Sequence, residues 1–317
     1  MNQPDSPTCP ICMDKVASSF LEEMYDDRYG CPNVVDIRKC GECGHCFCWP
    51  KLSNAELGPL YEKYYGRKAE TELGVHLTLR SRVARWIIGE NNLGQFAFKP
   101  ATNAKLLDIG SGDCQNLWDA QFVGFEAYGF DVDSTSAEIG ARNGLQVRSG
   151  HSVGAAYPDQ KFDIMQMNQV IEHFVDPAEQ LRDIGDHLAS KGLIFISTPN
   201  SGSLLRRLTG RKWLHWHVPY HHHHFSKNSL KTLVESEDWE VISRRTVTPL
   251  VWVVLQFRAI KMDSKLGEPN ETWQSGSERR GARLLELLLL AVAFLPIRLA
   301  DVLRMGDCQV MILGRRR

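Results

Sequence analysis

The stretch KLLDIGSGDCQNL, residues 105–117, predicts how this chain folds. Its apolar start, residues 106–109, has the character of a short buried strand, and it runs directly into the Gly-Ser-Gly of residues 110–112, after which a helix is expected. Glycines at a strand-to-helix turn let the backbone approach a ligand closely, beside the positive end of the helix. The dinucleotide fingerprint requires a third glycine where Gln115 stands, so a dehydrogenase is disfavoured.

Strands and helices alternate after this turn. The segment AYGFDVDS, residues 127–134, is a second apolar strand that ends in Asp131, at the distance from the glycines where a carboxylate can accept both ribose hydroxyls of a nucleotide. Further strands are expected at 163–167 and 193–197, with a helix of amphipathic spacing between them. The alternation predicts an α/β fold with a Rossmann-like, doubly wound and mostly parallel sheet.

The first fifty residues contain a possible metal site. Two Cys-x-x-Cys pairs can place four thiolates in a tetrahedron around a structural zinc ion, and the preferred ligands are Cys9, Cys12, Cys40 and Cys43. Cys43 and Cys46 form another such pair, but Gly44 follows Cys43, where a tight turn with positive φ is easiest. A set of buried free thiols is the alternative.

Composition narrows the class of protein. The chain has 317 residues, a hydrophobic fraction of 43% and a formal net charge of -1, which are typical of a globular protein and offer no basic excess for a nucleic acid. MNQPDSPTCP at the start has neither a basic region nor an apolar run. Nine cysteines without an export signal favour metal ligands or free thiols, so a reducing, cytoplasmic setting is expected.

Four segments in a fixed order resemble the class I S-adenosylmethionine-dependent methyltransferases: LLDIGSGDCQNL, GFDVD, FDIMQMNQVIEH and LIFISTPN. The resemblance covers about residues 105–201 and implies S-adenosylmethionine as the cofactor. In that family the acidic strand residue and the glycines hold the methionine and ribose parts, and the loop after the third strand passes the adenine. The cofactor-binding residues that this implies are Asp108, Gly110, Gly112, Asp131, His151, Ser152 and Asn168.

The flanking sequences resemble a bacterial subgroup of these enzymes that begins with a zinc ribbon. Its marks here are the cysteine pairs followed by LSNAELGPLYEKYY, and the order TPN, tryptophan, Pro-x-His and Phe-Ser within residues 197–226. Such proteins are often associated with polysaccharide or glycolipid biosynthesis or with sugar methylation. The resemblance implies a hydroxyl of a nucleotide-linked or lipid-linked sugar as the acceptor. The alternatives are O- or C-methylation of another small metabolite, such as a quinone precursor, and a non-catalytic cofactor-binding partner in a biosynthetic assembly.

Three side chains near predicted strand ends are candidates for catalysis: Glu172, His173 and His221. An alcohol acceptor must lose its proton, and histidine is the usual side chain for this near neutral pH. Glu172 and His173 can equally cap a helix or order their loop. A Glu-x-x-Glu-His motif in related quinone O-methyltransferases is linked to a divalent metal, and Gln169 replaces its first glutamate here. In YHHHHF, residues 220–225, His221 takes the recurring histidine position and is expected to face the pocket, whereas the next three lie outside or serve packing.

Residues 250–305 form an insertion between the last two expected strands, 238–249 and 306–317, which should form the antiparallel edge of the sheet. Its apolar run at 284–303 is interrupted by charges and a proline, and it is too short to span a bilayer. Basic residues on both sides suit the surface of an anionic membrane, such as the inner membrane face, and packing on its own domain or in a homodimer is the alternative. The chain thus divides into a zinc-ribbon-like segment (1–52), a helical linker (53–100) and a methyltransferase domain (101–317).

Overall fold

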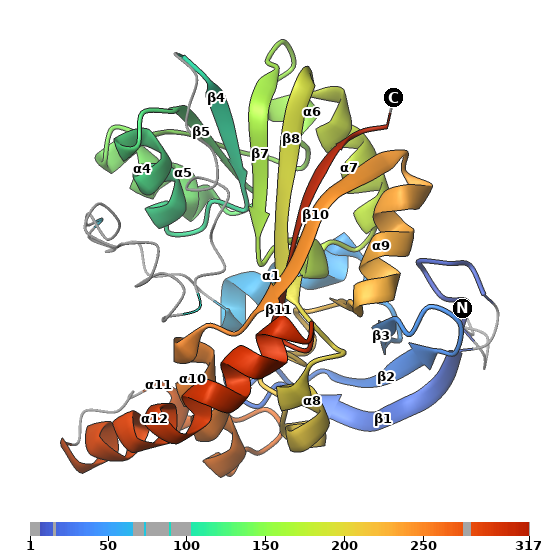
Figure 1. Cartoon of the computed structure of the whole chain (residues 1–317), viewed down its shortest axis with the longest axis vertical. Helices are drawn as coiled ribbons and strands as arrows, with labels where there is room; N and C mark the ends of the chain where they lie inside the picture. Colours follow the sequence, from blue (N-terminus) through green and yellow to red (C-terminus); the bar gives the residue numbers. More distant parts are fainter. Residues whose placement is uncertain are drawn as a thin grey trace.

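A seven-stranded sheet runs through the upper part of the molecule (Figure 1) in the computed structural model, which describes residues 7–14, 17–65, 73, 89, 103–274 and 280–316. The strand order is β6-β5-β4-β7-β8-β11-β10. The strands are β4 (Lys105–Ile109), β5 (Glu126–Asp131), β6 (Gln146–Ser149), β7 (Phe162–Asn168), β8 (Leu188–Pro199), β10 (Trp239–Val247) and β11 (Cys308–Arg315). The first five are parallel, and β11 runs antiparallel to both β8 and β10. The predicted mostly parallel α/β sheet is confirmed, with β11 alone reversed.

Helices cover both faces of this sheet, as Figure 1 shows. They are α4 (Gln115–Phe122), α5 (Ser134–Arg142), α6 (Val153–Ala156), α7 (Pro177–Asp186) and α9 (Lys227–Ser236). Consecutive residues of β4 belong to separate core clusters because side chains alternate along a strand. Leu106 packs with Leu117 of α4, and Leu107 belongs to the cluster that contains Leu181 of α7.

A second sheet has four strands in the order β1-β2-β3-β9. The first three come from the N-terminal region: β1 (Ala17–Tyr25), β2 (Val34–Cys40) and β3 (Cys46–Trp49). The fourth, β9 (His223–His224), comes from the YHHHHF segment and pairs Phe47 with His223 and Cys46 with His224. The last strand of the N-terminal sheet therefore comes from a part of the chain that follows β8 in the sequence.

The helix α1 (Asn54–Tyr64) follows this sheet, and it begins at a capping box formed by Ser53 and Glu56. This is the start of the expected helical linker. The rest of that linker, apart from residues 73 and 89, lies outside the described residues. Short helical turns complete the scaffold: η1 (Ile171–His173), α8 (Leu204–Thr209) and η2 (Gly210–Lys212).

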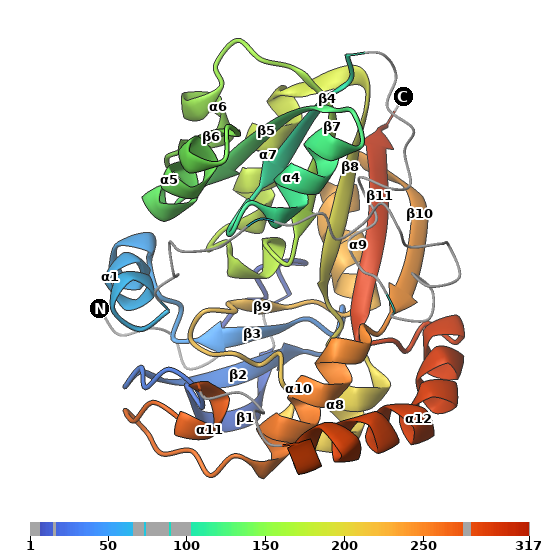
Figure 2. The same cartoon turned by 90° about the vertical axis from the view of Figure 1, so that its left-hand side faces the viewer.

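The insertion contains α10 (Leu250–Lys261), α11 (Glu271–Gln274) and α12 (Arg280–Val302). Arg258 of α10 and Glu286 of α12 form an ion pair at 2.7 Å. Figures 1 and 2 place α8, α10 and α12 at the same end of the molecule, with α12 along its outer edge. Within the described residues, no helix has the length and apolar character needed to cross a bilayer.

Candidate active site

The turn after β4 has the backbone shape that the two glycines allow. Gly110 and Gly112 have φ values of 69° and 56°, a region that side chains rarely adopt. A Cβ at Gly110 would also lie 2.4 Å from a methyl group of Val170. The amide of Gly112 donates to Asp131 Oδ2 at 2.8 Å, and the amide of Asp133 donates to Oδ1 at 3.0 Å. The Asp131 carboxylate therefore links the turn after β4 to the turn at the end of β5.

Asp108 lies beside this turn and is almost completely buried. Burial raises the pKa of its carboxyl to about 7, although the amide of Gln166 donates to Oδ1 at 2.9 Å. Its other oxygen, Oδ2, is buried and has no hydrogen-bond partner within the described residues. An uncompensated buried acceptor of this kind is costly unless a donor reaches it, so it fits a ligand that carries an ammonium group or hydroxyls.

The remaining expected cofactor residues follow the neighbouring strands. His151 is exposed after β6, and Ser152 caps α6 by accepting from the amide of Ala155 at 3.1 Å. Asn168 ends β7 and accepts a hydrogen bond from the hydroxyl of Ser197. The structure thus places all of these residues at or just beyond the carboxyl ends of parallel strands, where ligands of open α/β sheets bind.

We expect Asp131→Ala to weaken the binding of S-adenosylhomocysteine by about 1.5–3 kcal/mol, because it removes a charged acceptor and also releases the Gly112 turn. Isothermal titration measures this loss. The matched control is Asp159→Ala, an exposed carboxylate after α6, which should leave the affinity unchanged. Unchanged affinity in Asp131→Ala would remove that residue from the cofactor site.

Glu172, His173 and His221 form a second cluster, in which each offers a ligand atom within 4.8 Å of the others. Glu172 is fully buried, and its Oε2 accepts from the hydroxyl of Thr198 at 2.8 Å. Burial raises the pKa of this carboxyl to about 8, so the neutral acid is the main form at pH 7. The structure therefore brings together the three predicted catalytic side chains, two from η1 and one from the YHHHHF segment.

His221 is held in one orientation. Its Nδ1 lies 3.0 Å from the carbonyl oxygen of His215, which only a protonated Nδ1 can satisfy. Nε2 is then the accepting nitrogen, and the Nδ1 of His217 lies 3.4 Å from it. Burial, and then the neighbouring His173, hold the pKa of His221 well below its usual range. A neutral imidazole with an accepting nitrogen has the protonation state of a general base.

His173 brings α1 into the site. Its Nδ1 lies 2.7 Å from the hydroxyl of Tyr61, and its ring meets that of His221 edge to face at 4.6 Å. Tyr61 and Tyr65 both pack against Tyr220, with ring centroids 5.2 and 4.9 Å away. The sequence did not indicate the contact between Tyr61 and His173. Helical spacing predicts that the tyrosines of α1 lie on one face of the helix, but it does not show which residues that face contacts.

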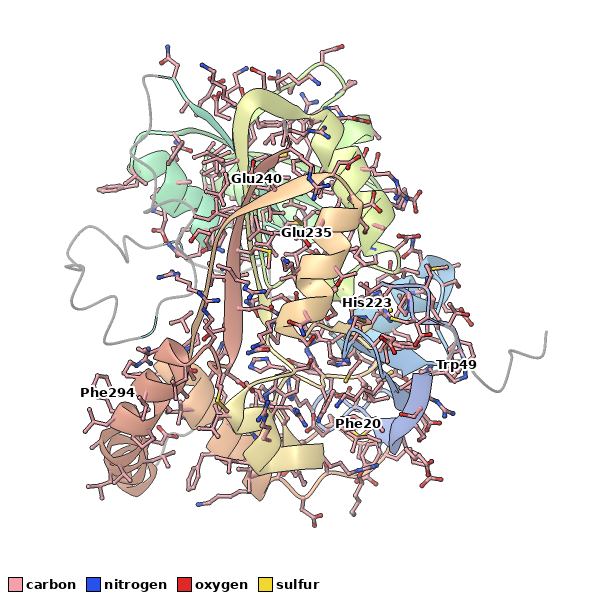
Figure 3. All side chains as sticks on the ribbon, turned by 45° about the vertical axis from the view of Figure 1, so that its right-hand side comes forward. Phe20, Trp49, His223, Glu235, Glu240 and Phe294 are labelled. Carbon is pink, nitrogen blue, oxygen red and sulfur yellow. The ribbon has the colours of Figure 1, made fainter. Side chains whose placement is uncertain are left out.

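The three histidines after His221 are not on the outside. His222, His223 and His224 are 3%, 3% and 1% exposed, so the expectation of an outer position is wrong and the packing role holds. His223 Nδ1 lies 2.9 Å from His45 Nε2, and His224 Nε2 lies 2.9 Å from the carbonyl oxygen of Trp216. Figure 3 shows His223 where the N-terminal sheet meets the larger domain. Burial lowers the pKa of these histidines to about 3, 3 and 4, in chain order.

Four cysteine sulfurs meet at the N-terminal sheet. All lie within 4.8 Å of one another, with Cys9 and Cys43 separated by 3.7 Å and Cys12 and Cys40 by 3.5 Å. A tetrahedron with zinc–sulfur bonds of about 2.3 Å has edges of about 3.8 Å, so these four fit a zinc ion. Cys46 instead lies in β3, paired with β9.

Comparison with known proteins agrees with this geometry. Residues 81–244, just over half of the chain, match the family model described as "Methyltransferase domain", and the chain belongs to that family. It is an S-adenosylmethionine-dependent methyltransferase of class I. Ubiquinone biosynthesis O-methyltransferase of Ruegeria pomeroyi is 26% identical over 184 residues, which cover 54% of this chain and 74% of that protein. The protein of the same name from Bartonella tribocorum is 28% identical over 117 residues, 35% of this chain and 47% of its own.

Among solved structures, a SAM-dependent methyltransferase from Archaeoglobus fulgidus is similar with a TM-score of 0.45 and 17% sequence identity. The similarity covers 74% of this chain and 98% of that chain.

Proposed function

We propose that this enzyme transfers the methyl group of S-adenosylmethionine to a hydroxyl of a sugar that is carried by a nucleotide or a lipid. The observation that carries the proposal is the orientation of His221, whose Nδ1 is anchored to the carbonyl oxygen of His215, so that Nε2 carries the lone pair that would accept a proton. Methyl transfer to a hydroxyl requires such an acceptor, whereas binding of the cofactor alone does not.

Each side chain then has a separate task. The β4 turn and Asp131 would hold the cofactor, which supplies an already activated methyl group. His221 Nε2 would take the proton of the acceptor hydroxyl as the hydroxyl oxygen displaces S-adenosylhomocysteine from the methyl carbon, and would later release that proton to water. His173, held by the Tyr61 hydroxyl, orients the acceptor beside His221. Positioning for in-line displacement is the larger part of such catalysis.

The cysteine cluster would hold one structural zinc ion, because four thiolates leave no open coordination position for chemistry. The hydrogen bond between Cys9 and Cys43 lowers the pKa of the Cys9 thiol and raises that of the Cys43 thiol, so the support for zinc is the arrangement of the four sulfurs. In this proposal zinc stabilises the N-terminal sheet. Its strand β3 pairs with β9, and this pairing positions the segment that contains His221.

A second acceptor class is favoured by the relatives, whose names place them in ubiquinone biosynthesis. An aromatic quinone precursor would also suit the tyrosines beside His221. The test is isothermal titration with S-adenosylhomocysteine, followed by turnover with nucleotide sugars and with hydroxylated quinone precursors. Turnover of the sugars alone supports the proposal, and turnover of the precursors alone replaces it. Cofactor binding with turnover of neither would indicate a non-catalytic partner.

The insertion supports a membrane-proximal setting. Five aliphatic side chains of α12, between 57% and 78% exposed, recur every three or four residues along one side of the helix: Leu288, Val292, Leu295, Leu299 and Val302. Figure 3 shows Phe294 on the same outer helix, away from both sheets. Exposed Lys261 and Arg304 lie at the ends of α10 and α12. We propose that this side of α12 contacts an anionic lipid surface.

We expect Leu295→Glu combined with Leu299→Glu to abolish most of the binding to anionic liposomes in low salt, because a charge in the interface opposes burial of the helix. Sedimentation measures the bound fraction. Ile242→Glu, an equally exposed aliphatic on β10, is the control and should bind as the unmodified protein does. If the unmodified protein does not sediment with lipid, α12 contacts another protein surface instead.

A further inference from the structure

A basic cavity of about 490 Å³ lies outside the catalytic cluster, between the cysteine-bearing turn, α8 and the end of α12. Five cationic side chains line it, against a single carboxylate: Lys39, Arg206, Arg207, Lys227 and Arg304, with Glu42. The whole chain carries a net charge of -1, so this concentration of positive charge is local. None of the five cations forms an ion pair with another described residue.

Arg206 is held in place by neighbouring groups. It is half-buried, its Nε donates to the carbonyl oxygen of Ser201 at 2.7 Å, and its guanidinium group lies 5.8 Å from the ring centre of Phe20. Burial lowers the pKa of this group, and the adjacent charge of Arg207 lowers it further. With Nε engaged, the two terminal nitrogens keep the fork that binds the oxygens of a phosphate.

The cavity also has a defined place between two features already described. Its rim includes Leu303, which is exposed and follows directly on the apolar side of α12. Ser226, which also lines the cavity, lies five residues after His221, so their Cα atoms are at most about 18 Å apart. The cavity is thus lined both by the residue that follows α12 and by a residue close in sequence to the proposed base.

We infer that this cavity binds the phosphate or diphosphate group through which the acceptor is attached to its carrier. The inference rests on the proposed function, because it assumes that the acceptor is a carried sugar. Uncompensated guanidinium and ammonium groups are the partners that phosphate oxygens prefer. A neutral quinone precursor carries no phosphate to pair with these cations, so the cavity favours a carried sugar over the second acceptor class.

The test is isothermal titration of the full-length protein with inorganic pyrophosphate in low salt. Arg206→Gln and, separately, Arg207→Gln should weaken pyrophosphate binding by about 10–100-fold, as expected for loss of a charge-assisted hydrogen bond. Arg207 is exposed on α8, so its replacement leaves the core intact. Arg142→Gln, an exposed arginine on α5, is the matched control and should bind pyrophosphate as the unmodified protein does.

Competition identifies the carrier. Displacement of pyrophosphate by uridine diphosphate supports a nucleotide carrier, and displacement by phosphatidylglycerol vesicles supports a lipid carrier. Absence of pyrophosphate binding, or equal weakening in Arg142→Gln, overturns the inference. Loss of zinc from Arg206→Gln also overturns it, because the cations would then serve the negatively charged thiolate cluster.

Failure of this inference can be told apart from failure of the proposed function. Affinity for S-adenosylhomocysteine should be the same in all three variants, since none of these residues lies at the β4 turn. If a phosphosugar is methylated with an unchanged KM in Arg206→Gln, the proposed function stands and the anion site does not. If pyrophosphate binding depends on Arg206 but no sugar is methylated, the anion site stands and the assigned acceptor class does not.

Discussion

Replacing His221 with alanine should lower turnover by about 10²–10⁴-fold, the contribution typical of a general base. The affinity for S-adenosylhomocysteine should stay nearly unchanged, because the expected cofactor residues follow the ends of β4 to β7, whereas His221 contacts His173, His215, His217 and His224. The measurement combines steady-state turnover on the acceptor that proves active with isothermal titration. His221→Gln serves as a second variant, since an amide can hydrogen-bond the acceptor but cannot take its proton.

His223→Ala is the matched comparison within the same histidine run. His223 is buried in β9 and contacts His45, so its replacement should lower the melting temperature. Turnover of the protein that remains folded should change little. If both alanine variants show equally mild losses of turnover, His221 is not the base, and the role of the four histidines is to pack between the two sheets.

Removal of zinc should have the other large effect. In small zinc domains the bound ion contributes about 10–16 kcal/mol at neutral pH, and this binding energy is also folding energy. We expect one zinc per chain by elemental analysis, and Cys40→Ser should release it and unfold the N-terminal sheet. Circular dichroism during heating should show an early transition. Cys31→Ser, outside the cluster, should keep the metal; full stability in a metal-free protein would contradict the proposal.

Loss of zinc should also reduce turnover, although no cysteine of the cluster belongs to the active site. The cysteine cluster can affect His221 through the backbone, because β3 pairs with β9 and β9 begins two residues after His221. Cys48 also lies in β3, and its thiol donates a hydrogen bond to the carbonyl oxygen of His221 at 3.1 Å. Chelation should therefore lower turnover before it weakens binding of S-adenosylhomocysteine.

The sequence predicted those parts of the fold that depend on local chemistry. The strand, turn and helix at 105–117 follow from apolar residues next to two glycines, and they appear as β4, a turn with positive φ, and α4. The amphipathic helix between the later strands likewise appears as α7. In each case the pattern and its partner lie within a few residues of one another.

The features that the sequence did not predict concern contacts between distant segments. YHHHHF contains no alternation that would mark a strand, and its pairing partner lies about 175 residues earlier, so nothing local indicated β9. The neutral form of Glu172 depends on complete burial in the folded chain, which a sequence cannot show. The contact of Tyr61 with His173 depends in the same way on where α1 docks.

The late strand of the N-terminal sheet has a consequence for how the chain is made. A ribosome adds about 5–20 residues per second, so roughly 9–35 seconds separate the synthesis of β3 from that of β9. Throughout that interval the edge of β3 that will receive β9 is unpaired, and an unpaired strand edge invites association with other chains. Early capture of zinc by the four cysteines would hold the nascent sheet in place until its last strand emerges. Zinc supply during translation, rather than after it, should thus decide the yield of soluble enzyme.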